Sequence, residues 1–415
     1  LTYFFEKYLA VPAKISSLEA LIVFFSKVLC KLQLTCGLPV FSMPIVEKLS
    51  GKEGKFLVWV PTILTECLSP LVDHVISIIN HHANQSTFLP SKELEVKLND
   101  CLETMKTKAP RGRNSLSFLK LAYEENWPWK QIYNDTFLYG YGACSRWLNS
   151  TLTDQMPFLS VEIMHDKRIF STFLQETGFP GPEQFLVVKE SETVTLARKM
   201  KYPVVIKPVD QANGRGVFAN LMSDEEVKYA YRAAKKLSNQ IIIEKHVSGN
   251  DYRLLVVDSK VIWVIERKVG GVIGDGVHTI ETLLNNLNEE RKSSTILVSI
   301  QVTKETINYL KAQGFNLKSI PLKGDFIPLQ RNANVGLGGT PIPISLEDIH
   351  PENIKLAENI VTLLGADIVG VDFISPNISE PYFNNGGKII EVNAQPLTHP
   401  KIHKTLLSSL IPHKW

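Results

Sequence analysis

Short apolar runs alternate with amphipathic segments from residue 161 onward. The runs are rich in β-branched residues, which favours strands. The segments between them space their apolar residues three or four positions apart, as helices with one buried face do. The runs that predict strands cover residues 161–164, 185–188, 204–207, 240–244, 254–257, 261–266, 326–331, 367–374 and 388–393. The segments that predict helices cover residues 167–177, 191–200, 223–237, 279–288, 303–313 and 351–364.

Residues 185–244 follow the order strand, helix, strand, loop, helix, strand. This order predicts a compact α+β unit, and we expect residues 199–246 to act as a lid over a nucleotide. Residues 254–266 predict a hairpin that turns at Asp258, Ser259 and Lys260.

The first 160 residues have a weaker pattern. A strand is predicted over residues 56–64, where Pro61 indicates an edge or an early stop, and a strand with a bulge over residues 137–146. Helices are predicted over residues 15–30, 68–80, 92–108 and 116–125. We therefore expect a mixed α/β N-terminal domain over residues 1–160 and an α+β domain over residues 161–415.

Composition narrows the class of protein. The 415 residues are 44% hydrophobic and 21% charged, as in ordinary globular proteins. A net charge of +3, with no basic stripe among aromatics, argues against nucleic-acid binding. Five cysteines without a CxxC pair favour reduced thiols in a cytoplasmic protein. Residues 15–30 form the most apolar early stretch, which contains Glu19 and Lys27 and is too short to span a membrane.

Residues 202–217 (YPVVIKPVDQANGRGV) carry the clearest candidate chemistry. A buried β-branched strand ends at Lys207 and is followed by a loop that contains Gly214 and Gly216. The lysine supplies a positive charge, and the glycines let backbone N–H groups approach phosphate oxygens. The stretch therefore predicts a polyphosphate site; the alternative is a strand that ends in a surface turn.

Two acidic strands lie near the end of the chain, at DIVGVDFI (residues 367–374) and KIIEVN (residues 388–393). Antiparallel pairing of these strands would place Asp372 beside Glu391 and Asn393. Glu391 and Asn393 are two positions apart and share one side of a strand. Their oxygens suit Mg²⁺, and buried acids are costly without a cation. The alternative is that these side chains lie at strand ends in water.

The second part of the chain resembles the ATP-grasp ligases, and more closely the ATP-grasp half of cyanophycin synthetase. The matching motifs run in family order from about residue 138 to 396. They are LYGYGACSRWLNSTLTD, the DK of HDKRIF, VVIKP, NGRGV, IIIEKHVSGNDYRLLVV, GDGVHTI, QRNANVGLGGT, IHPEN, VGVDFI and IIEVNAQP. The sequence ends at Trp415, so we expect the Mur-ligase-like half of that family, which adds arginine, to be absent. The match is faint before Trp127.

The resemblance implies an ATP-grasp fold, in which two α+β subdomains enclose the nucleotide, with ATP and Mg²⁺ as cofactors. It implies nucleotide contacts for a set of residues in and around the lid. These are Lys167 and Lys207 at the phosphates, the loop Asn213, Gly214, Arg215 and Gly216 over them, Glu244, Lys245 and Val247 at the adenine, and Asp251 at the ribose.

The resemblance also implies the reaction-centre residues. Asp372, Glu391 and Asn393 would hold Mg²⁺, commonly two ions. Arg331 would steady the transferring phosphoryl group, with Arg267 as a further catalytic candidate. Substrate contacts would come from Arg253, Arg331, Asn334, Gly338 and Gly339. His278 and Thr279 are expected to build a turn and a helix cap.

The implied activity is ATP-dependent joining of a carboxylate and an amine through an acyl phosphate, with release of ADP and phosphate. We expect an amino acid or a peptide as substrate, chosen by the N-terminal region, and a homo-oligomer. Two alternatives remain: a kinase that stops after phosphoryl transfer, and an inactive nucleotide-binding regulatory module.

Overall fold

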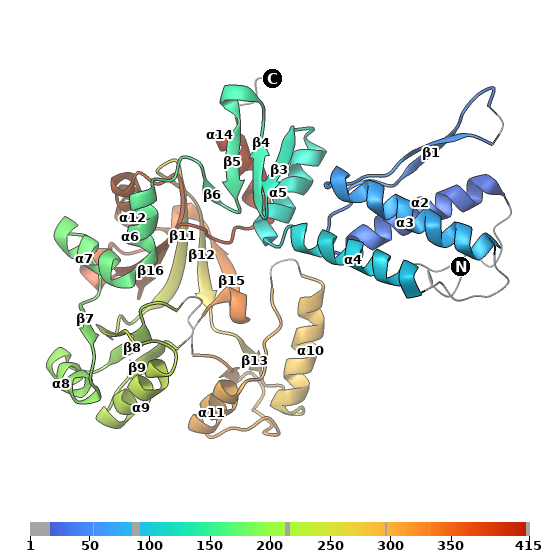
Figure 1. The fold of residues 1–415 in the computed structure, drawn as a ribbon. Helices are drawn as coiled ribbons and strands as arrows, with labels where there is room; N and C mark the ends of the chain where they lie inside the picture. Colours follow the sequence, from blue (N-terminus) through green and yellow to red (C-terminus); the bar gives the residue numbers. More distant parts are fainter. Residues whose placement is uncertain are drawn as a thin grey trace. The chain divides into compact units, whose positions relative to one another are not determined.

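The computed structural model describes residues 17–52, 54–84, 92–211, 216–294, 297–331 and 333–411. The predicted loop residues Asn213, Gly214 and Arg215, and residues 15–16 of the first predicted helix, lie outside these ranges. The chain divides into a first unit, residues up to 154 together with residues from 400 onward, and a second unit, residues 155–399 (Figure 1). Across the described ranges, no helix combines the length and the apolar character that a membrane span requires.

Helices α2, α3 and α4 form one core of the first unit. Each helix turns apolar side chains inward, so Val28, Leu71 and Leu98 are buried in a shared cluster. Strand β2 ends before Pro61, as the sequence predicts. The elements in this part are α2 (Leu18–Thr35), the antiparallel strands β1 (Ile45–Lys48) and β2 (Phe56–Trp59), α3 (Thr65–Asn84) and α4 (Lys92–Lys108).

The rest of the first unit combines an antiparallel sheet with two helices. Helix α14 packs on α5, where the rings of His403 and Phe118 are 4.9 Å apart. The strand predicted over residues 137–146 is interrupted, because a short 3₁₀ helix at Gly142–Cys144 turns the chain between two strands. The elements are α5 (Arg113–Glu124), β3 (Trp129–Tyr133), β4 (Thr136–Tyr139), β5 (Arg146–Asn149), β6 (Leu152–Thr153) and α14 (Pro400–Leu410).

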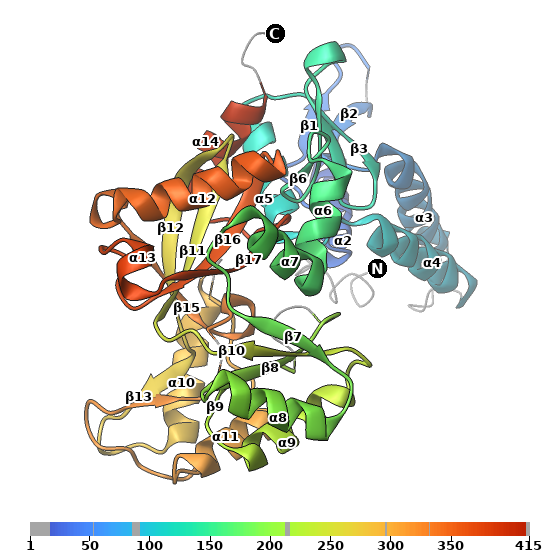
Figure 2. The ribbon, with the colours of Figure 1, turned by 90° about the vertical axis from the view of Figure 1, so that its left-hand side faces the viewer.

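The predicted α+β unit is present in the second unit as a sheet with strand order β7-β10-β8-β9. Helices α8 and α9 cover one face of this sheet (Figure 2). Ser223 is the N-cap of α9, and α8 starts one residue earlier than predicted, after Lys189. The elements are β7 (Gln184–Val187), α8 (Glu190–Met200), β8 (Val204–Pro208), β9 (Phe218–Leu221), α9 (Asp224–Lys235) and β10 (Ile241–Lys245).

A larger antiparallel sheet in the order β15-β12-β11-β16-β17 forms the centre of the second unit. The predicted hairpin and the predicted pair of acidic strands are both confirmed. Helix α12 packs on β11 and β12. The elements are β11 (Asn250–Val257), β12 (Lys260–Lys268), β15 (Thr340–Ile344), α12 (Pro351–Leu364), β16 (Ile368–Ser375), α13 (Tyr382–Asn385) and β17 (Lys388–Asn393).

A smaller subassembly extends from this sheet and has its own apolar core around Ile280, Leu310 and Ile327. The N-caps of its helices are Thr279 and Thr303, whose hydroxyl groups accept backbone N–H bonds. The expected roles of His278 and Thr279 in a turn and a cap are confirmed. The elements are β13 (Gly271–Ile273), α10 (Ile280–Lys292), α11 (Lys304–Ala312) and β14 (Phe326–Pro328).

One predicted strand is wrong. Residues 161–164 lie inside helix α6 (Phe158–His165), which follows Pro157 and packs on β17. Three of these four residues are apolar, and so short a run fits a helix turn as well as a strand. The next prediction holds, because Asp166 caps α7 (Lys167–Thr177) and Gly178 ends it.

Gly249, between β10 and β11, offers a test of this arrangement. A Cβ atom there would lie 2.4 Å from the carbonyl carbon of Ser375, and the φ of Gly249 is +147°. Gly314 also has a positive φ, +80°, but open space around it. We expect Gly249→Ala to lower the free energy of unfolding by about 2–4 kcal/mol and Gly314→Ala by about 1 kcal/mol in urea titrations. Equal losses would contradict the close approach at Gly249.

Candidate active site

A row of charged side chains crosses the central sheet. Strand register places Arg267 opposite Asp251, Arg253 opposite Asp372, and Asp372 opposite Glu391. Opposite residues on neighbouring strands project from the same face. The pleat thus gathers these charges on one face, which we call the charged row.

Asp372 is the anion at the centre of the charged row. Its Oδ1 accepts from Arg253 Nε at 2.7 Å, and its Oδ2 accepts from Arg253 Nη2 at 2.9 Å. Arg267 Nη2 lies 3.2 Å from Oδ2. Burial disfavours the ionised form, but the two guanidinium groups outweigh burial and lower the pKa of the Asp372 carboxyl group. Asp372 is therefore held as a carboxylate.

Glu391 lies directly across from Asp372 in a different environment. Among the described residues its carboxylate makes no hydrogen bond or ion pair within 4 Å. Burial and the nearby charge of Asp372 raise the pKa of Glu391, and the positive charges of Lys167, Lys207 and Arg253 oppose that shift. A half-buried carboxylate without a partner is costly in the protein alone.

This donor set fits Mg²⁺. Glu391 has free oxygens, Asp372 keeps acceptor capacity because a carboxylate has about four lone-pair sites, and Asn393 adds an amide 3.4 Å from Asp372. In the described part of the chain there is no cluster of three His, Cys, Asp or Glu side chains that could hold a metal. A cation here would therefore use two carboxylates, one amide oxygen and the oxygens of a bound phosphate, as Mg²⁺ commonly does.

The two predicted phosphate lysines come from different elements. Lys207, near the end of β8, is buried and forms an ion pair with Glu244 on β10. Lys167, the first residue of α7, donates from Nζ to the carbonyl oxygens of Val209 (3.3 Å) and Gln211 (2.9 Å). Both ammonium groups act electrostatically on Glu391. The lysines and the acidic strands thus belong to one electrostatic site.

The remaining predicted nucleotide residues lie beside this site. Lys245 donates from Nζ to the carbonyl oxygen of Lys201, and Val247 follows in the segment between β10 and β11. Asp251 accepts from Arg267 at 3.0 Å. Gly216 has a φ of +74° next to Pro208. Contacts of these residues with adenine and ribose stay predictions.

Of the predicted substrate residues, Arg253 lies on β11 in the charged row, and the others form a second group in the loop before β15. Asn334 accepts a 2.8 Å bond from the Gly336 N–H, and its carbonyl oxygen accepts from Gly339 N at 3.0 Å. The exposed guanidinium of Arg331 lies 4.7 Å from the ring centre of Tyr309. This loop leads into β15, where Pro341 pairs with Arg267 on β12. Within the described ranges, no hydrogen bond joins Arg331 to the charged row.

Sequence reasoning missed Arg291, which anchors this loop. The side chain lies on α10 and is 4% exposed. Its Nη1 donates to the carbonyl oxygens of Gly338 (2.7 Å) and Val298 (2.8 Å), and its Nη2 donates to Thr340 Oγ1 (3.1 Å). Burial lowers the pKa of Arg291. An arginine in a last helical turn is usually solvated, so the sequence carries no signal that singles it out.

Comparison with known proteins identifies the fold of this chain and a family whose sequences match part of it. The protein family described as D-Ala–D-Ala ligase C-terminus matches residues 173–321, which include Lys207 and the arginines of the charged row. A crystal structure of a bifunctional glutathione synthetase from Pasteurella multocida shares the fold, with a TM-score of 0.54 at 20% sequence identity; the match covers 82% of this chain and 49% of that one. The chain has an ATP-grasp fold.

Within that class, the sequence is similar to cyanophycin synthetases. It is 35% identical to the enzyme of Trichormus variabilis over 74% of this chain and 34% of that protein. It is 30% identical to the glutathione biosynthesis bifunctional protein GshAB of Clostridium perfringens, over 60% of this chain and 33% of that protein. The predicted resemblance is confirmed, and the chain spans about a third of the length of these curated relatives.

The unpartnered carboxylate of Glu391 gives one test of the metal site. Glu391→Gln removes a buried charge, so we expect a gain of about 1 kcal/mol in the free energy of unfolding at neutral pH in EDTA. Added Mg²⁺ should stabilise the wild type and not the variant, as read from urea titrations. The exposed Glu162 provides a control, Glu162→Gln. A loss of stability in EDTA for Glu391→Gln would contradict the assignment.

The Arg291 anchor gives a second test. Arg291→Met leaves the carbonyl oxygens of Gly338 and Val298 without their donor, and the loop should loosen. We expect hydrogen–deuterium exchange at residues 336–340 to speed up by about ten-fold or more, which corresponds to ~1.4 kcal/mol of lost protection. Arg232→Met, which breaks only an exposed pair with Glu190, should leave exchange in this loop unchanged. Unchanged exchange in Arg291→Met would show that the loop keeps its conformation without the hydrogen bonds from Arg291.

Proposed function

We propose that this chain is an ATP-dependent carboxylate–amine ligase. One observation carries the proposal: the Asp372 carboxylate, held by Arg253 and Arg267, lies opposite the Glu391 carboxylate on paired strands. Lys167, Lys207 and Arg253 supply the positive charge that a triphosphate needs. Glu391 and Asp372 supply the oxygens that a metal bound to that triphosphate needs. Similarity to synthetases and to a ligase domain supports the same chemistry.

The chemical problem is that a free carboxylate is a poor electrophile. An amine that attacks it directly would have to expel an oxide. Transfer of the γ-phosphoryl group to the carboxylate oxygen releases ADP and makes an acyl phosphate. The amine then attacks the acyl carbon, loses a proton, and displaces inorganic phosphate as the amide forms.

The protein contributes position and charge to these steps. The ammonium groups of Lys167 and Lys207 would neutralise phosphate oxygens of the nucleotide. Asp372, Glu391 and Asn393 would hold Mg²⁺, which offsets the negative charge of the phosphates when bound. Arg331, Asn334, Gly338 and Gly339 would meet the substrate carboxylate, and the unit that contains β7–β10 would exclude water from the acyl phosphate.

We propose an amino acid or a peptide as the acid substrate, because the similar proteins include a glutathione biosynthesis protein and the matching family is described as a D-Ala–D-Ala ligase C-terminus. Recognition of that substrate is assigned to the first unit. That unit carries no part of the charged row. A kinase and a nucleotide-binding module are the outcomes that the assay below separates from a ligase.

The test is release of ADP and phosphate over a panel of amino acids and dipeptides, singly and in pairs, with mass spectrometry of the products. We expect turnover to require both an acid and an amine, and hydroxylamine to trap the activated acid. Lys207→Ala should reduce turnover by at least about 10²-fold, because charge neutralisation at the phosphates is lost. Lys260→Ala, which breaks an exposed pair with Glu358, should not reduce it.

Other outcomes have definite meanings. A stable phosphorylated product without amine dependence would identify a kinase. Nucleotide binding without turnover over the whole panel would identify a binding module. Near-normal rates in Lys207→Ala would remove Lys207 from the site.

A further inference from the structure

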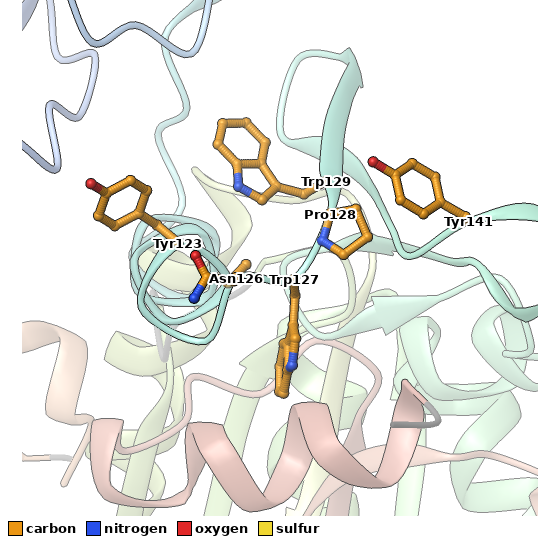
Figure 3. Close-up of a pocket in the computed structure, with 7 residues that line it drawn as sticks. Tyr123, Asn126, Trp127, Pro128, Trp129 and Tyr141 are labelled. Carbon is orange, nitrogen blue, oxygen red and sulfur yellow. The ribbon is translucent and has the colours of Figure 1, made fainter. Parts of the chain in front are cut away.

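The first unit contains a cavity of about 410 Å³ that has no role in the proposed ligase chemistry. Its wall is formed where helix α5 ends and strand β3 begins, together with Tyr141 from the loop after β4. Figure 3 shows Tyr123 and Tyr141 on either side of Trp129, with Trp127 below. Four aromatic rings therefore surround one space.

Two of these rings are accessible to solvent and to a ligand. Trp127 is 7% exposed and forms the floor, whereas Tyr123 is 45% and Tyr141 is 71% exposed. Phe41 stacks on Tyr123 at 5.4 Å between ring centres, and Phe137 contacts Trp129 edge-on at 6.4 Å. Neighbouring aromatics therefore brace two of the rings.

The electrostatics of the wall are negative. Aromatic faces carry negative partial charge. The cavity also lies at the C-terminus of α5, where the Tyr123 carbonyl oxygen accepts from Asn126 N–H at 3.3 Å and the last helical carbonyls carry partial negative charge. Glu124 and Glu125 follow Tyr123 in sequence, but each is paired with a lysine, Lys120 at 3.8 Å and Lys404 at 2.6 Å, so they add no net charge. No lining residue is basic, and the rings and the helix end favour a positive ligand.

We propose that this cavity is a binding site for an organic cation, held by an alkylammonium or guanidinium group. A cation over tryptophan and tyrosine faces is attracted by the ring quadrupoles, and a guanidinium can also stack on them. An anion would be repelled by the faces of the rings and by the C-terminus of α5. A neutral apolar ligand would gain nothing from the ring quadrupoles or from the helix end. The proposal is independent of the ligase assignment, because no residue of the charged row lines the cavity.

The test is calorimetric titration of the full chain with matched pairs of probes that differ in charge. Choline is compared with 3,3-dimethylbutanol, and N-acetyl-arginine methylamide with N-acetyl-citrulline methylamide. We expect at least one cation to bind and its neutral partner to bind about five-fold more weakly or worse. The two pairs distinguish an ammonium ligand from a guanidinium ligand. Equal binding within both pairs, or no binding of either cation, would overturn the proposal.

Variants locate the binding. Trp129→Leu should weaken cation binding by about 5- to 30-fold, and Trp129→Phe should restore most of it, because an aromatic face returns. Tyr141→Leu changes an exposed ring and should weaken binding without a folding defect. Trp147→Leu, on β5 and outside the cavity lining, is the matched control. Wild-type affinity in both Trp129→Leu and Tyr141→Leu would overturn the proposal.

Discussion

Asp372 depends on two guanidinium groups, and the candidate site depends on Asp372. An isolated carboxylate inside a sheet would take up a proton rather than stay charged. The bidentate bond from Arg253 and the further contact from Arg267 keep it ionised. With that charge secured, Glu391 across the ladder is left with unused oxygens. One paired and one unpaired carboxylate side by side form the donor set that we propose for a cation.

Sequence pattern predicted most of the second unit because its signals are local. Lys207 at a strand end, the helix that starts after Asp166, and the pairing that sets Asp372 against Glu391 could all be found by inspection. The helix over residues 158–165 could not be predicted in this way, because a short apolar run has no periodicity that distinguishes a helix from a strand.

The charged row lay beyond sequence reasoning for a different reason. The residues of the row were candidates one by one, but their meeting depends on the order in which β12, β11, β16 and β17 join the sheet. The spacing of apolar residues along the chain does not predict the order in which distant strands join a sheet. Arg291 was missed for a similar reason, since its partners Val298, Gly338 and Thr340 lie 7 to 49 positions away. Resemblance to a family supplied residue roles that physical pattern alone left open.

The final described helix has a consequence for how the chain can be cut. Helix α14 follows the second unit in sequence but packs on α5 of the first, through Phe118 and through the ion pair of Lys404 with Glu125. The second unit is therefore an insertion within the first, tethered at both of its ends. A cut near residue 399 would leave the sheet that carries the charged row intact, and it would remove α14 from its contact with Glu125, 279 positions earlier in the chain. The unit destabilised by such a cut is therefore not the one that lies next to the cut in sequence.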